Sequence, residues 1–320
     1  MTTLELTVCR FVEHKRALGR KYESEEAELR LLTRYAEEHG ASRLEELTPV
    51  LLDDFLASRS RPRPHGFNHL LGVVRRLLNW AVAHELLEAS PLQTRPRRET
   101  ATRIPFLFNV TQARRLLDAA AALPDYTQAP QRGATYRTIF ALCYGLGLRV
   151  GEASALRVGD VDRTRNLLVV RRGKFGKSRL VPHGPRIAEL VGQQLQRRSD
   201  GVLLDDDAPL FTFDGERSVH PRSVSATFHR LVLALGFTAP PGVSPPVLHS
   251  LRHSFAVGCL LRFYRQGLDP AARLGRLSTF MGHVDPVSTS IYLTITPALM
   301  EEANRRYEAF AEPVWSEMER

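Results

Sequence analysis

Apolar side chains recur every three or four positions through much of residues 5–40, which is the spacing of amphipathic helices. The second of these helical segments ends at Gly40, and a Thr-Pro pair then starts the segment LTPVLLDDFLASRS. A further apolar stripe runs over residues 67–90, after the basic, proline-broken turn RPRPHGF. This pattern predicts a bundle of four helices within residues 1–95.

Beyond residue 106 the pattern is helical with one exception. Residues 135–148 are apolar nearly all round, which predicts a buried helix. The exception is NLLVVRRGKFGKSRLVPHG, where two short β-type runs flank glycine-rich cationic residues and predict a β-hairpin. Residues 96–105 are polar and are expected to link two domains. The expected fold is mainly α with a small β-hairpin or sheet (α+β), in which the helical bundle precedes a domain over 106–320.

The composition fits such a two-domain chain. Its 320 residues are 43% hydrophobic, enough for real cores, and no apolar run approaches the length of a membrane helix. The charged N-terminal stretch MTTLELTVCRFVEHKR is unlike a signal peptide. Cys9, Cys143 and Cys259 lie far apart and lack CxxC spacing, which argues against disulfides and structural zinc. We therefore expect a protein of the reducing cytoplasm with no membrane partner.

Positive charge is concentrated in the larger part of the chain. Residues 1–95 hold 14 basic and 14 acidic side chains, so the rest hold 30 and 21 of the 44 and 35 in total. Such an excess favours a polyanion as partner. A soluble protein of high pI that has no such partner explains the excess equally well. Only four of the basic residues are lysines, and two of them, Lys174 and Lys177, lie in RRGKFGKSRLVP. Because lysine can release its proton and arginine cannot, this segment is a candidate for proton chemistry, unless the clustering is chance.

Two short motifs carry candidate site residues. In GLGLRVGEASAL, Glu152 follows Arg149 by three positions, so one helical turn would let the carboxylate hold the guanidinium. An ordinary surface ion pair is the alternative, but the apolar flanks favour a partly buried pair. In HSLRH, His249 and Arg252 share a helix face, and His253 is expected on another face. No carboxylate or cysteine accompanies these histidines, so a metal site is not expected.

The stretch GHVDPVSTSIYL adds His283 and Tyr292. Tyr292 either fills a core or uses its hydroxyl in chemistry. Paired carboxylates for metal-dependent nuclease chemistry and a GxxxxGK[ST] loop for ATP are both missing from the sequence. Two arginines suit a phosphodiester, a tyrosine can attack phosphorus, and a lysine can protonate the departing alkoxide. The residues therefore indicate DNA strand transesterification without metal or nucleotide cofactor.

In this order, the motifs GLRVGE, the lysine hairpin, HSLRHSFA, MGH and a following tyrosine resemble those of the tyrosine recombinase (phage integrase-like) family. The resemblance covers nearly the whole chain. It implies that residues 1–95 are a DNA-contacting core-binding domain and residues 106–320 a catalytic domain. The region between HSLRHSFA and MGH is similar to that of recombinases of transposons and other mobile elements.

The resemblance also implies roles for individual residues. Arg149 and Arg252 would grip the scissile phosphate, and Glu152 would support the first of them. Tyr292 would be the nucleophile that forms a 3′-phosphotyrosyl link. The remaining implied roles are a general acid at Lys174, with Lys177 as the competing candidate, a proton-moving histidine at His249, and a phosphate-bonding histidine at His283.

The partners implied are double-stranded DNA with specific recombination sites and further copies of the chain. A tetramer on DNA, working through a Holliday junction, is expected, and the amphipathic segment PALMEEANRRYEAF would dock on a neighbouring subunit or on its own domain. A partner recombinase or directionality factor and association with the bacterial nucleoid are further expectations. Two alternatives remain: a type IB topoisomerase that relaxes DNA, and a catalytically silent DNA-binding accessory protein.

Overall fold

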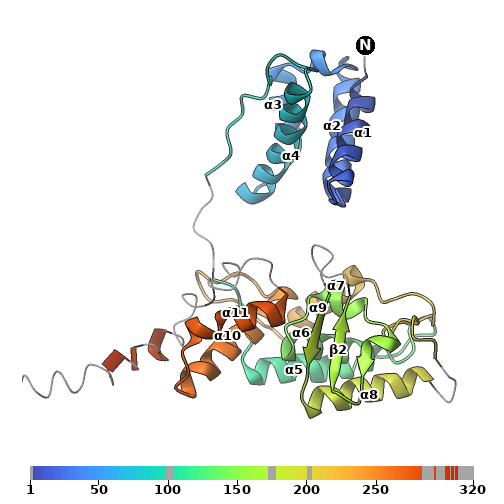
Figure 1. Ribbon diagram of the computed structural model, residues 1–320, viewed down its shortest axis with the longest axis vertical. Helices are drawn as coiled ribbons and strands as arrows, with labels where there is room; N and C mark the ends of the chain where they lie inside the picture. The colour runs from blue at the N-terminus through green and yellow to red at the C-terminus, as the bar shows by residue number, and fades with distance from the viewer. Residues whose placement is uncertain are drawn as a thin grey trace, which may run out of the picture. The chain divides into compact units, whose positions relative to one another are not determined.

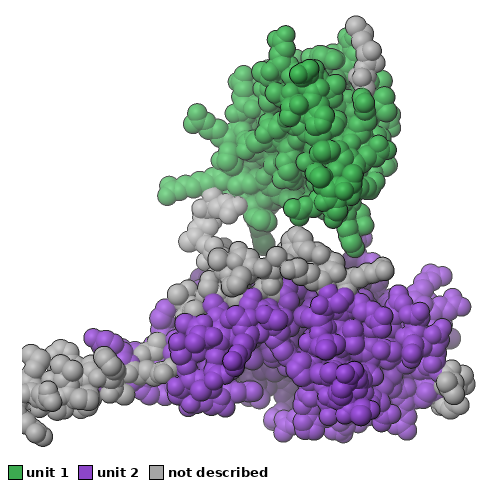
Figure 2. Space-filling view, viewed as in Figure 1, with its two compact units in different colours: residues 1–102 green, residues 103–320 purple. Residues whose placement is uncertain are grey.

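The computed structural model describes residues 3–98, 104–171, 178–199 and 204–282, together with residues 292, 300–302, 304, 305, 307 and 308. The chain divides into two compact units, Met1–Thr102 and Arg103–Arg320, which Figure 2 colours separately. In the described residues, no helix is both long and apolar enough to cross a membrane.

Unit 1 is helical, as the apolar spacing predicts. Its α-helices are α1 (Leu4–Ala17), α2 (Glu23–Glu38), α3 (Pro49–Ser58) and α4 (Pro64–Ala83), and a short 3₁₀ turn η1 (Leu44–Glu46) precedes α3 (Figure 1). The hydroxyls of Thr3 and Thr48 accept hydrogen bonds from backbone N–H groups in the first turns of α1 and α3. Helix α2 ends before Gly40, because the φ of +79° at this glycine is incompatible with a right-handed helix.

Helix α4 differs from the sequence expectation at both ends. It begins at Pro64, inside the expected turn RPRPHGF, because proline at the first helical position needs no hydrogen bond for its nitrogen. It ends at Ala83 rather than near residue 90, and Glu85 adopts a left-handed backbone with φ of +57°. The apolar side chains of α4, with those of α1, α2 and α3, form a continuous core.

The chain after α4 returns along that helix. The side-chain amide of Asn68 donates to the carbonyl oxygen of Arg97 at 2.8 Å and accepts from its backbone N–H at 2.7 Å. The Arg97 guanidinium lies 3.8 Å from the centre of the Phe67 ring. The first part of the expected linker, at 96–98, is therefore held against unit 1.

Unit 2 holds the remaining elements. Its helices are α5 (Val110–Ala121), α6 (Arg132–Gly145), α7 (Val150–Ser154), α8 (Pro185–Ser199), α9 (Pro221–Ala234), α10 (His249–Arg265) and α11 (Pro270–Met281), with a 3₁₀ turn η2 (Val158–Asp160) after α7. Helix α6 is buried along most of its length, as its all-round apolar pattern predicts, and it packs against α5, α8 and α10 (Figure 1). Phe140 of α6 and Phe228 of α9 are fully buried in the core that holds these helices together.

A three-stranded antiparallel sheet lies beside these helices, in the order β1 (Val161–Asp162), β2 (Leu167–Val170) and β3 (Arg179–Pro182). The predicted hairpin is confirmed, since β2 pairs with β3 from Leu167 opposite Pro182 to Val170 opposite Arg179. Strand β1 was not predicted, because two residues are too short to show alternation. Helix α11 was not predicted either, and it begins at Pro270 after an Asp269 side-chain cap.

Candidate active site

The first arginine of the site is fixed by its own short helix. Arg149 precedes α7, and its backbone N–H and its Nη1 both donate to the Glu152 carboxylate, at 3.0 and 2.7 Å. Its side chain keeps 23% of its surface exposed, whereas the Glu152 side chain keeps 6%. The ion pair expected from the three-residue spacing is present, and it is partly buried as the apolar flanks indicated.

Arg252 is the second arginine and lies in the first turns of α10. Its side chain is 1% exposed, and Nη2 donates to the Met281 carbonyl at 2.7 Å while Nη1 donates to the Gly147 carbonyl. Nη1 also lies 3.9 Å from Glu152 Oε2. Its Nε is buried and has no acceptor among the described residues. Burial lowers the pKa of Arg252 to about 10, with the positive charge of Arg149 acting in the same direction, so the group stays cationic at neutral pH.

A third arginine, not predicted from the sequence, joins them. Arg179 is the first residue of β3 and is 12% exposed. Its two terminal nitrogens bond the two oxygens of Glu152 at 3.0 and 2.9 Å, a bidentate arrangement that only a planar guanidinium provides. Arg149, Arg179 and Arg252 around Glu152 are called the arginine cluster below. The sequence offered one signal: Arg179 lies two positions before the apolar Val181 in the predicted strand, so both side chains share the strand face on which Val181 is buried.

Glu152 is ionised in this setting. Burial by itself would raise the pKa of Glu152, but the hydrogen bonds from Arg179 and Arg149 outweigh burial and lower the pKa to about 2. Three guanidiniums and one carboxylate leave the arginine cluster with two net positive charges. Two positive charges beside a partly exposed guanidinium suit a phosphodiester anion.

The C-terminus of helix α11 completes the arrangement. Its last carbonyl groups lack partners within the helix and carry the negative end of the helix dipole. Three consecutive carbonyls each accept from one member of the cluster: Phe280 from Arg179 at 2.9 Å, Met281 from Arg252 at 2.7 Å, and Gly282 from Arg149 at 3.1 Å. Gly282 has φ of +68°, and a Cβ there would come 2.7 Å from Nη1 of Arg179. Glycine is therefore required both by the backbone and by the close guanidinium.

The tyrosine lies next to a histidine that sequence reasoning placed elsewhere. Tyr292 is 3% exposed, and its hydroxyl is 2.8 Å from Nδ1 of His253. The ring of His253 is also 4.6 Å from that of His249, one turn earlier on α10. The expectation that His253 lies on another helix face than His249 is wrong, because residues four apart on a helix are neighbours. That spacing was the signal available in the sequence.

Burial and nearby positive charge set the protonation states of His253 and Tyr292. Burial lowers the pKa of His253 to about 4, and the positive charge of Arg252 adds to the effect, so the imidazole is neutral at pH 7. Burial raises the pKa of Tyr292, against the opposing influence of Arg252 and Arg149, so its hydroxyl is protonated. Both groups are therefore neutral, and the imidazole tautomer decides which of them donates in this hydrogen bond. The ring of Tyr292 packs with apolar residues of α10 and α11, so the residue fills a core and keeps a polar contact at once.

Three of the expected site residues, Lys174, Lys177 and His283, lie outside the described residues. His249 is exposed at the start of α10, beside His253. The structure thus brings together Arg149, Glu152 and Arg252 in one cluster, and Tyr292 with the histidine pair on the same helix as Arg252. Within the part of the chain that is described, no group of three or more His, Cys, Asp or Glu could hold a metal ion.

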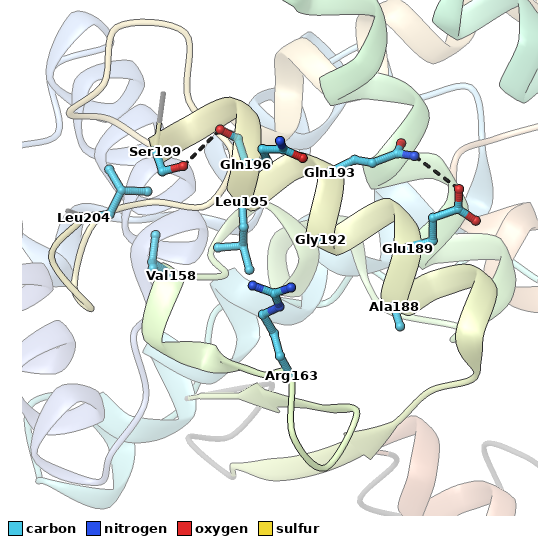
Figure 3. Close-up of a pocket in the computed structure, with 10 residues that line it drawn as sticks. All are labelled: Val158, Arg163, Ala188, Glu189, Gly192, Gln193, Leu195, Gln196, Ser199 and Leu204. Carbon is cyan, nitrogen blue, oxygen red and sulfur yellow. Dashed lines mark hydrogen bonds between the residues drawn. The ribbon is translucent and has the colours of Figure 1, made fainter. Parts of the chain in front are cut away.

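A depression of about 660 Å³ lies elsewhere in unit 2, along α8. Figure 3 shows Glu189, Gln193 and Gln196 of that helix at its rim, with Arg163 on the opposite side. None of the residues that line it belongs to the arginine cluster. Its charged and amide groups are already paired in part with one another, as the Gln193–Glu189 hydrogen bond of 3.2 Å illustrates.

Known proteins match this chain in sequence and in fold. The model of the phage integrase family matches residues 108–298. A Sinorhizobium fredii protein named as an integrase/recombinase (y4rB) is 34% identical over 96% of this chain and 98% of its own. The tyrosine recombinase XerD of Lacticaseibacillus casei is 28% identical over 72% of both chains. The structure of the Tn1549 transposon integrase with circular intermediate DNA has the same fold, with a TM-score of 0.65 at 16% identity over 97% of this chain and 100% of that one.

The chain belongs to the phage integrase family, and it is a tyrosine recombinase, an enzyme that transfers DNA strands. The two alternatives, a type IB topoisomerase and a silent accessory protein, are not favoured by these relatives. The expected fold class, mainly helical with a small sheet, is confirmed.

Proposed function

We propose that Arg149 and Arg252 bind the two non-bridging oxygens of a scissile DNA phosphate. The observation that supports this most directly is the buried Nε of Arg252, which has no acceptor among the described residues, beside a cluster of two net positive charges. A buried N–H without a partner costs free energy, so a ligand that supplies an acceptor is bound favourably. As negative charge grows on the phosphorus oxygens in the transition state, the two guanidiniums stabilise it.

In the proposed reaction, the oxygen of Tyr292 forms a bond to phosphorus and the bond from phosphorus to the 5′-oxygen breaks. The tyrosine proton passes to His249, and Lys174, or Lys177 in its place, protonates the departing 5′-oxygen. A 3′-phosphotyrosyl link and a free 5′-hydroxyl result. His283 bonds the phosphate, and Glu152 holds Arg149 in place. Attack by a second 5′-hydroxyl reverses these steps on a new partner strand and forms a Holliday junction.

We further propose that the partner is double-stranded DNA with specific recombination sites, bound by a tetramer of this chain. Unit 1 would serve as the core-binding domain and unit 2 as the catalytic domain. The full-length similarity to the Sinorhizobium integrase/recombinase and the region between HSLRHSFA and MGH support a role in moving a mobile genetic element. A partner recombinase or directionality factor would set the direction of the reaction.

The test is capture of the covalent intermediate. Purified protein is mixed with nicked duplexes from the DNA that flanks its gene, and the products are run on a denaturing gel. A nick close to the cut lets the short 5′-hydroxyl strand diffuse away, so the link to the enzyme accumulates. We expect a slowly migrating adduct that Tyr292→Phe abolishes.

Tyr264→Phe is the matched control, because Tyr264 lies on α10 and packs against the same apolar cluster as Tyr292. It should form the adduct at the unchanged rate. An adduct that persists in Tyr292→Phe would contradict the nucleophile assignment. Salt-sensitive DNA binding with no adduct on any duplex would favour the accessory role instead.

A further inference from the structure

Arg179 differs from the other two members of the arginine cluster in the element that carries it. It comes from the sheet, whereas Arg149 and Arg252 belong to the helical part, so it joins β3 to both α7 and α11. Its Nε and both terminal nitrogens are used: one contact goes to the Phe280 carbonyl and two go to Glu152. Glu152 also holds Arg149, and the two carbonyls that follow Phe280 hold Arg252 and Arg149.

The first of these groups is the Glu152 carboxylate. Arg149 Nη1 and Arg179 Nη1 share Oε1, at 2.7 and 3.0 Å, while Arg179 Nη2 and the Arg149 backbone N–H share Oε2, at 2.9 and 3.0 Å. Without Arg179, the carboxylate would keep only Arg149 and the more distant Arg252 as partners. A carboxylate with fewer bonds is free to rotate, and the Arg149 guanidinium would rotate with it.

The second group is the turn that closes α11. Arg179 bonds the carbonyl of Phe280, and the next two carbonyls hold Arg252 and Arg149. Arg179 also lies against Gly282, at a distance that leaves no room for a side chain. The position of this turn therefore sets where both phosphate-binding guanidiniums point, and Arg179 is what ties the turn to the sheet.

We propose that Arg179 is a positioning residue of the phosphate site: it orients Glu152 and the α11 C-terminus so that Arg149 and Arg252 meet the scissile phosphate together. This inference rests on the proposed function. Arg179 itself need not touch the DNA. Misplacement of catalytic groups by about 1 Å costs on the order of 100-fold in rate, and we expect a loss of that size when Arg179 is removed.

The experiment measures single-turnover formation of the tyrosyl adduct on the nicked duplex by Arg179→Met and Arg179→Lys, together with DNA affinity and melting temperature. Arg179→Met should cleave about 100-fold more slowly while it binds DNA as the unchanged protein does. Arg179→Lys, which keeps the charge but cannot bond both carboxylate oxygens in a fork, should be intermediate. Arg165→Ala is the matched control, since Arg165 bonds Asp162 at the other end of the same sheet, and it should cleave normally.

A duplex with an uncharged methylphosphonate at the cut site separates positioning from general stability. It carries less negative charge for the arginines to stabilise. The difference in adduct-formation rate between Arg179→Met and the unchanged protein should therefore be smaller on this duplex than on the phosphodiester duplex. An equal rate difference on both duplexes would overturn the inference and assign Arg179 a purely structural role. Normal cleavage by Arg179→Met would overturn it too. If Arg179→Met does not fold, the same comparison with Arg179→Lys decides.

An adduct formed by the unchanged protein and lost in Tyr292→Phe establishes the proposed function independently. Failure of the positioning role is therefore distinguishable from failure of that function.

Discussion

At the scale of single residues, Glu152 is the group on which the arginine cluster depends. It is the one carboxylate among the described residues that contacts Arg149, Arg179 and Arg252. Removal of the carboxylate would leave buried guanidinium charges uncompensated. This lowers the free energy of unfolding by more than the loss of a surface ion pair does. The cluster is therefore stable only while Glu152 is ionised.

This dependence predicts how acid affects stability. The pKa of Glu152 is about 2 in the folded protein against an ordinary 4.5, so between these values the unfolded chain binds more protons than the folded one. The stabilisation is complete above pH about 4.5 and is lost as the pH falls through about 2, and the pKa difference corresponds to at most about 3 kcal/mol. Glu152→Gln should lower the melting temperature at pH 7, and the difference from the unchanged protein should shrink between pH 5 and pH 2.

Thermal melts followed by circular dichroism across that range provide the measurement. The control is Glu189→Gln, an exposed carboxylate on α8 that bonds only a neighbouring glutamine among the contacts described. A difference between Glu152→Gln and the unchanged protein that does not vary with pH would contradict an ionised, arginine-bound Glu152.

At the scale of secondary-structure elements, the end of α11 organises the site. Helix termini have carbonyl groups free to accept hydrogen bonds, and here three of them take one arginine each. The turn that follows needs the left-handed backbone of Gly282. An element boundary, rather than a loop, thus determines how the cationic groups converge.

Gly282→Ala tests this role. Both this change and Gly267→Ala, at the end of α10, place an alanine at positive φ, which costs about 1 kcal/mol. A Cβ at position 267 meets nothing within 4 Å, whereas one at 282 would come 2.7 Å from Nη1 of Arg179. Gly282→Ala should therefore slow adduct formation, and Gly267→Ala should not, although both lower the melting temperature. Equal cleavage by the two variants would argue against a role for the α11 terminus in the reaction.

At the scale of the whole molecule, charge is distributed unevenly along the chain. The net charge of +9 comes from residues 96–320, since residues 1–95 hold equal numbers of basic and acidic groups. Cations that bind phosphates release condensed counterions, so affinity for DNA falls as salt rises. The net charge bears on association with DNA and not on the fold.

The expected result is a steep, linear fall of the logarithm of affinity with the logarithm of salt concentration. If the full chain makes six or more phosphate contacts, affinity should fall by about 1,000-fold or more between about 50 and 200 mM salt. Titration of a labelled duplex by fluorescence anisotropy measures the slope. A slope near zero would contradict binding through the phosphate backbone.

Much of the fold was predictable because its signals are local. Apolar spacing identified most of the helices, the β-type runs around the lysine segment identified the hairpin, and the Thr-Pro pair marked the start of α3. Helix α11 and strand β1 were missed. The region that holds α11 was interpreted only by its similarity to recombinases of mobile elements, and β1 is too short to show alternation. The ion pair of Arg149 and Glu152 was also predictable, since partners three positions apart meet on one turn.

By itself, then, the sequence determined the helical class, the hairpin, the family and the residue types of the candidate site. Only the tertiary structure decided that Arg179 bonds Glu152 from 27 positions away, and that His253 bonds the hydroxyl of Tyr292 from 39 positions away. It also decided that the carbonyls at the end of α11 accept from three guanidiniums. The physical reason is that helical periodicity and capping involve neighbours along the chain. Pairing between distant side chains depends on how the packed elements bring them together, and that packing is a property of the whole core.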